Sequence, residues 1–205
     1  TLKMPYSVHY SGALEFSAVA DVVKKHYRFN TGELKNELPL AIPRKEYTEN
    51  TIVFLDDNKA LQSSIYFYVN GNVNDIKERA LAQAFNKYFG SGMASLVFQE
   101  IREFRSMAYA AYGFYRTANN PDAPGYLTAY VGTQADKTIE AISIMDSLIH
   151  RMPKKDRVNI IKTSLLQSIN SSKPSKRDLS ASVEKWLLNA YESDPREVEY
   201  HIFNQ

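Results

Sequence analysis

Hydrophobic and polar residues recur along this chain with two different periods, which predict an alternation of strands and helices. A period of two, with many β-branched and aromatic residues, predicts strands over residues 6–12, 51–55, 64–69, 108–115 and 126–133. A period of three to four predicts helices over residues 15–27, 73–89, 94–104, 139–149, 156–170 and 179–191. The second and third strands are separated by the turn residues Asp56, Asp57 and Asn58, so we expect them to form a pair.

The order of these elements, β-α-ββ-αα-ββ-ααα, predicts the fold class. Strand pairs with helices grouped between them are typical of an α+β domain with a mostly antiparallel sheet. We therefore expect a two-layer sandwich in which helices cover one face of the sheet, forming a single domain over residues 1–205. Both ends of the chain resemble cut ends, so we expect it to be a fragment of a longer polypeptide.

Composition excludes several classes of protein. Hydrophobic residues make up 44% of the chain and aromatic residues 12%, which excludes a disordered or low-complexity chain. No run approaches the roughly 18 apolar residues of a membrane span, so we expect a soluble protein. The absence of cysteine excludes disulfides, thiolate nucleophiles and Cys-ligated zinc. A net charge of +2, from 25 basic and 23 acidic residues, does not favour a nucleic-acid partner.

Residues 88–134 contain several short motifs in a fixed order. They are Gly90-x-Gly92-Met93-x-Ser95, Phe98-Gln99-Glu100-Ile101-Arg102-Glu103, Ala108-Tyr109, Gly125-Tyr126 and Val131-Gly132-Thr133. This stretch resembles the insulinase/pitrilysin family of zinc metallopeptidases, and in particular the domain that follows the zinc-bearing domain in each repeat. It is also similar to subunits of mitochondrial processing peptidases. The resemblance implies a metallopeptidase-like half domain within a two-repeat polypeptide, either periplasmic or cytoplasmic.

The zinc-binding motif of that family is missing. H-x-x-E-H places two histidines on adjacent turns of one helix as metal ligands, and its glutamate serves as general base. The four histidines here, at positions 9, 26, 150 and 201, are never four residues apart. The resemblance therefore implies that Zn²⁺ belongs to a complementary H-x-x-E-H domain, in cis or in trans. We expect this fragment to bind no metal or other cofactor and to be inactive in isolation.

Arg102 and Tyr109 match a second device of the family, an arginine and a tyrosine seven residues apart. The resemblance implies that they bind carbonyl groups of a peptide substrate and support the transition state across a closed cavity. A guanidinium and a phenol O–H are donors suited to that task. Without the resemblance, Arg102 would be interpreted as a surface ion-pair partner of Glu103 or a neighbouring acidic residue, and Tyr109 as a half-buried strand aromatic.

Two functions remain as hypotheses. In the first, the chain is the substrate-binding, cavity-completing domain of a zinc-dependent endopeptidase. In the second, it is a non-catalytic scaffold or partner subunit of an inactive or heterodimeric family member. The tyrosines of residues 108–130 could line a substrate cavity or pack under helices, and the pattern does not separate these alternatives.

Overall fold

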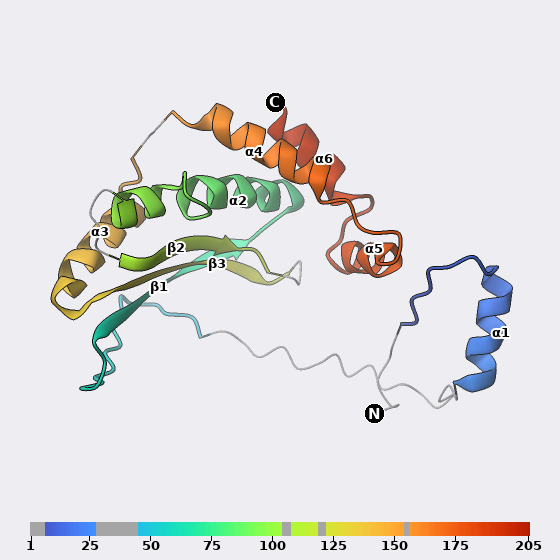
Figure 1. Ribbon diagram of the computed structural model, residues 1–205, viewed down its shortest axis with the longest axis horizontal. Coiled ribbons are helices and arrows are strands. Elements are labelled where there is room, and N and C mark those ends of the chain that lie inside the picture. The colour runs from blue at the N-terminus through green and yellow to red at the C-terminus, as the bar shows by residue number, and fades with distance from the viewer. Residues whose placement is uncertain (1–6, 28–44, 104–107, 119–121, 154–155) are drawn as a thin grey trace.

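The computed structural model describes residues 7–27, 45–103, 108–118, 122–153 and 156–205. Its centre is a three-stranded antiparallel sheet in the order β1-β3-β2 (Figure 1). The strands are β1 (Gln62–Val73), β2 (Ala108–Arg116) and β3 (Pro124–Gln134). The expected α+β class with an antiparallel sheet is confirmed.

Helices cover one face of this sheet. The helices of the described residues are α1 (Phe16–His26), α2 (Ile76–Phe89), α3 (Thr138–His150), α4 (Val158–Ser171), α5 (Leu179–Leu188) and α6 (Pro195–Phe203), with a π-helical turn η1 (Phe98–Glu103) and a 3-10 turn η2 (Ala135–Lys137). α2 lies against the sheet, and α4 and α6 pack on α2 from its far side (Figure 1). α1 stands apart from this body and has no buried residue.

The hydrophobic core lies between the sheet and the helices. A first cluster joins the sheet, α2, η1 and α3, and contains Phe89, Val97, Ile101, Ala129, Val131, Ala141, Met145 and Leu148. A second, smaller cluster joins α2, α4 and α6 through Ala80, Leu165 and Phe203. Strand residues alternate, so the side chains adjacent to these core positions point to the other face of the sheet.

α2 is held tightly at both ends. Asp75 and Glu78 form a capping box at its start, with the Glu78 amide donating to Asp75 at 2.8 Å. Near its end, the Asn86 side chain donates to the Tyr115 carbonyl at 2.9 Å and accepts from the Tyr115 amide at 2.7 Å. Asn86 thereby satisfies the backbone amide and carbonyl of one residue on the outer edge of β2, as a further strand would do.

Glycine allows α2 to approach β2. A Cβ atom at Gly113 would lie 2.4 Å from the Phe89 ring, and one at Gly90 would lie 2.1 Å from the Gly113 carbonyl oxygen. These distances leave no room for a larger residue at either position. Gly90 is also the C-cap residue of α2.

Two expected strands do not form. Residues 7–12 and 51–55 are irregular, while Tyr6 lies outside the described residues. The expected pairing of 51–55 with 64–69 is wrong, because β1 pairs with β3 instead. The side chains of residues 52–55 remain exposed, up to 96% for Ile52. A β-prone run becomes a strand only when a neighbouring edge pairs with it, and periodicity does not identify that neighbour.

The helical predictions also need correction at two places. The expected helix over 94–104 is reduced to η1, and residue 104 lies outside the described residues. α6 was not predicted, although Asp194 caps it by accepting from the Arg196 amide and Pro195 occupies its first turn. An Asp-Pro pair before a short periodic run is the signal that would have found it.

Candidate functional site

Arg102 lies on η1 and is an exposed residue. Ile101, the preceding residue, is fully buried in the core and fixes this turn against the sheet. The Arg102 guanidinium lies over the Phe98 ring, 5.0 Å from its centroid. Among the described residues, no ion pair joins Arg102 to Glu103. Its planar donor groups are therefore accessible to a ligand.

Tyr109 occupies a β-bulge in β2. Ala108 pairs with Thr133 and Ala110 pairs with Gly132, which leaves Tyr109 as the extra residue. Ala108 and Ala111 both pack against the core, so regular alternation back from Ala111 would place residue 109 towards the helices. The bulge changes this orientation, and the Tyr109 side chain is 57% exposed.

The Tyr109 hydroxyl is hydrogen-bonded on the face of the sheet that the helices do not cover, which we call the uncovered face. Gln134 Nε2 donates to Tyr109 Oη at 3.3 Å, and Gln134 follows Tyr130 and Gly132 on that face of β3. Because the hydroxyl accepts this bond, its own hydrogen remains able to donate. Tyr109 is thus an exposed donor rather than the half-buried aromatic that strand propensity alone indicates.

Arg102 and Tyr109 come from neighbouring elements, since η1 packs against β2. No hydrogen bond between them occurs among the described residues, and residues 104–107 between them are not described. Both side chains are exposed. Such a pair is available to a bound molecule and contributes little to the packing of the domain.

Tyrosines gather on the uncovered face. Tyr66 of β1 and Tyr112 of β2 both pair with Tyr130 of β3, and their ring centroids lie 4.9 and 5.2 Å from that of Tyr130. We call Tyr66, Tyr130 and Tyr112 the tyrosine ladder. Its rings point away from the core. Of the tyrosines in residues 108–130, Tyr112 and Tyr130 therefore do not pack under the helices. Tyr115 differs, because its hydroxyl donates to Asn74 at 3.1 Å at the end of the sheet.

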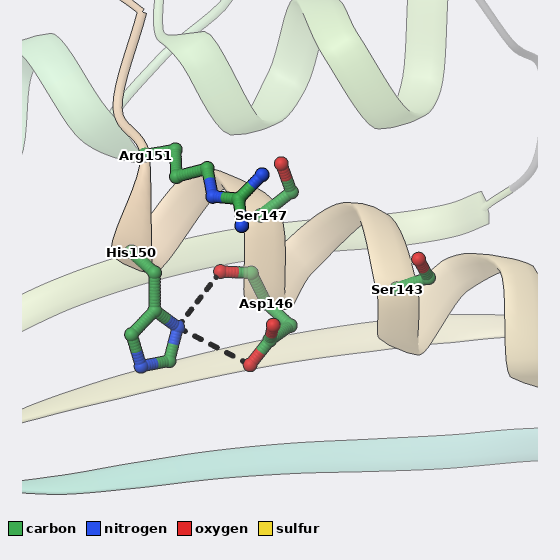
Figure 2. A pocket seen from close by; sticks show the side chains of 5 residues that line it. All are labelled: Ser143, Asp146, Ser147, His150 and Arg151. Atoms are coloured by element: carbon green, nitrogen blue, oxygen red, sulfur yellow. Dashed lines mark hydrogen bonds and ion pairs between the residues drawn. The ribbon is translucent and has the colours of Figure 1, made fainter.

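A separate hollow lies on the outer surface of α3 (Figure 2). It is lined by Ser143, Asp146, Ser147, His150 and Arg151. His150 Nδ1 lies 3.2 Å from the Asp146 carboxylate and 3.0 Å from its main-chain oxygen. Neither serine hydroxyl is hydrogen-bonded to His150, so the arrangement lacks the nucleophile–base contact of a hydrolytic triad. The pair is an exposed i,i+4 interaction at a helix C-terminus.

A second hollow lies between α2, α4 and α6, where Gln83 donates to the carboxylate of Glu199. Burial of that carboxylate raises the pKa of Glu199 above its ordinary value. In contrast, the Ser7 hydroxyl and His9 lower the pKa of Glu184 on α5. Within the described part of the chain, no group of three or more His, Asp or Glu residues could hold a metal ion.

None of the described helices is long and apolar enough to cross a membrane. Comparison with known proteins adds the family. The family model described as "Peptidase M16 inactive domain" matches residues 12–165, from the residues before α1 into α4. The chain belongs to this family. The expected resemblance to the non-zinc domain of insulinase/pitrilysin peptidases is confirmed.

Solved structures share the fold at low sequence identity. A peptidase M16 inactive domain from Pseudomonas fluorescens is 17% identical with a TM-score of 0.58, and the match covers 70% of this chain and 35% of that one. A protease from Helicobacter pylori is 17% identical with a TM-score of 0.55, covering 95% and 50%. The periplasmic protease PqqL from Escherichia coli is 15% identical with a TM-score of 0.67, covering 95% and 22%.

This M16 chain therefore spans at most half of the length of those three solved chains. It has no significant match among curated proteins. The finer resemblance to mitochondrial processing peptidase subunits stays a prediction. The assignment of Arg102 and Tyr109 as site residues also stays a prediction. It did not include Gln134, the hydrogen-bond partner of Tyr109, although Gln134 follows directly after the Val131-Gly132-Thr133 motif.

Proposed function

We propose that this M16 inactive domain is the substrate-binding, cavity-completing domain of a zinc-dependent endopeptidase. Residues 1–205 would form one domain of a longer, two-repeat protein, and the metal would belong to an H-x-x-E-H domain in cis or in trans. In this proposal, the chemistry assigned to this chain is to bind and orient the substrate and to stabilise charge that develops on it. A protein of this kind works in the periplasm or the cytoplasm.

The observation that carries this proposal is the bulge at Tyr109. A bulge inserts an extra residue and interrupts the regular pairing of two strands. Bulges concentrate next to active sites because they redirect a side chain. Here the redirected side chain is a phenol, held by Gln134 and exposed on the uncovered face. A position that served only packing would need no such rearrangement.

Arg102 supplies the complementary group. η1 is a π-helical turn. Such turns are rare in proteins, and those that occur are frequently at functional sites. Arg102 has donors that can engage two carbonyl oxygens, while Tyr109 has one O–H. Together they would hold the carbonyl groups of an extended peptide and stabilise negative charge that develops on the scissile carbonyl oxygen. The proposed substrate is thus a peptide, and the proposed partner of this domain is the zinc-bearing domain.

A non-catalytic scaffold or partner subunit is the second candidate function. The run from Ile52 to Leu55 favours it, because its side chains are 72–96% exposed. Exposed apolar patches of this kind mark protein interaction sites. This candidate predicts that Arg102 and Tyr109 can be changed without effect on peptide turnover.

Kinetics of the complete zinc-bearing protein separate the two candidates. Arg102→Ala and Tyr109→Phe should each lower kcat/KM by about 10²-fold, as loss of one transition-state donor does, with bound zinc unchanged. Tyr200→Phe on α6 is the matched control, because it removes an exposed hydroxyl far from the sheet. Activity within a factor of about two of wild type in both site variants would favour the scaffold.

A further inference from the structure

We propose that the tyrosine ladder is a specificity surface that selects peptides carrying an aromatic or large aliphatic side chain beside the carbonyl held by Tyr109. This inference rests on the proposed function and extends it, because it names the side chain that the substrate must present. The occupant is a neutral, apolar segment of the peptide substrate.

The first argument is the geometry of the ladder. Tyr66, Tyr130 and Tyr112 occupy one matched row across all three strands, with both ring separations near 5 Å: 4.9 Å and 5.2 Å. Rings at these separations form a continuous aromatic surface. None of the three belongs to either core cluster, and Tyr66 is 71% exposed. The row therefore presents apolar area that packing of the domain does not use.

The second argument is continuity with Tyr109. The pair Ala110 and Gly132 is the row next to Tyr112 and Tyr130 on the same face, and the bulge places Tyr109 at that row. Adjacent rows on one face are two residues apart, or about 7 Å at the rise of a strand. An extended peptide with a carbonyl at Tyr109 therefore places a side chain one or two residues away on the ladder.

The third argument is charge. Charged residues make up 23% of the chain, but the three strands contain only one, Arg116 at the end of β2. The ladder hydroxyls are polar without being ionic, and that of Tyr130 lies 3.3 Å from Ser64 Oγ. When an aromatic or aliphatic side chain covers these rings, no charged group is buried without a partner. A substrate carboxylate would lose hydration there and find no cation in the row.

Substrate selectivity of the complete zinc-bearing protein tests the proposal. A series of peptides differs only at one residue near the scissile bond, which is Phe, Leu, Ser or Asp. We expect kcat/KM to favour Phe and Leu over Ser and Asp by about tenfold or more, which is the scale of apolar side-chain discrimination. Scanning this residue over the positions on both sides of the scissile bond locates the one that contacts the ladder.

Variants then assign the preference to the ladder. Tyr66→Ala should reduce the ratio to about threefold or less; its exposure makes a folding defect unexpected. Tyr112→Ala should act in the same direction, while Tyr112→Phe keeps the ring and restores the ratio. Tyr200→Ala on α6 is the matched control, since Tyr200 is 42% exposed and Tyr112 37%, and should leave the ratio unchanged.

The outcomes distinguish this inference from the function on which it rests. Tyr109→Phe should lower kcat/KM for all peptides by the same factor and leave the ratio intact. If the ladder variants lower all peptides equally, or change nothing, the specificity surface is refuted. Loss of association with the zinc-bearing domain in Tyr66→Ala, seen by size-exclusion chromatography, also overturns it by making the face a domain interface. If Arg102→Ala and Tyr109→Phe are silent while the ladder variants abolish the ratio, the donor roles fail and the specificity surface stands.

Discussion

The two faces of the sheet are built from the same three strands but obey different rules. On the covered face, Val131 and Ala129 are fully buried, and a Cβ atom at Gly113 would lie 2.4 Å from the Phe89 ring. On the uncovered face, the tyrosine ladder and Tyr109 expose ring and hydroxyl to solvent. The difference indicates that stability resides mainly in the covered face, while the recognition that we propose would use the other. Substitutions on the two faces should therefore differ in what they change.

The largest expected effect is at the centre of the covered face. Phe89→Ala should lower the free energy of unfolding by about 3–5 kcal/mol, because it removes a fully buried ring and leaves a cavity. Phe16→Ala on α1 is the matched control, since that ring is 85% exposed and should cost less than about 1 kcal/mol. Urea unfolding curves measure both. Equal losses in the two variants would show that the core is not where the structure places it.

A pair of glycines compares the two faces directly. Gly113→Ala should destabilise the protein by about 1–3 kcal/mol, because the new Cβ would lie 2.4 Å from the buried Phe89 ring. In Gly132→Ala, the nearest atom is the Tyr130 hydroxyl oxygen at 2.8 Å, the end of a side chain on the uncovered face that can rotate. Thermal unfolding should therefore show a clearly smaller loss for Gly132→Ala, and the reverse order would contradict the assignment of faces.

Removal of the two hydrogen bonds between the Asn86 side chain and the Tyr115 backbone should have an intermediate effect on stability. Asn86→Ala leaves the amide and carbonyl of Tyr115 without their side-chain partner, and we expect a loss of about 1–3 kcal/mol. Asn70 provides a control, because its side chain donates to the carbonyl of Tyr47 at 3.1 Å and makes no further hydrogen bond within the described part of the chain. Hydrogen exchange of the Tyr115 amide should accelerate in Asn86→Ala and stay unchanged in Asn70→Ala.

The smallest expected effect is a pH dependence at the periphery. Because burial raises the pKa of Glu199, its contribution disfavours the folded state increasingly as pH rises above about 4.3. Glu199→Gln should therefore flatten that part of the stability profile, by less than about 1 kcal/mol given its partial exposure. Glu184 has the opposite sign, since Ser7 and His9 lower its pKa and its contribution disappears as pH falls below about 4.3. Unfolding of Glu199→Gln and Glu184→Gln, measured from about pH 3 to 7 beside the wild type, checks both signs. A change of slope in the same direction in the two variants would contradict them.

Much of the local structure could be predicted from periodicity. The apolar stripe of α2 and the alternation of β2 and β3 gave elements within a few residues of those observed. These elements bury their own apolar faces, so pattern and environment agree. The strands expected at 6–12 and 51–55 failed because alternation shows only that a segment suits a sheet, and the free edge that it would need lies outside the segment.

The candidate site divides in the same way. The sequence by itself determined which donors this protein carries, Arg102 and Tyr109, and that its histidines cannot form H-x-x-E-H, because residue identity and spacing are local properties. Only the tertiary structure decided that Tyr109 is the extra residue of a bulge and that its side chain is exposed, because a bulge is a mismatch between two strands and shifts every later side chain by one position. It also decided which face the helices cover. That choice depends on how Gly90 and Gly113 let α2 approach the sheet, a contact between segments that no single stretch of sequence records.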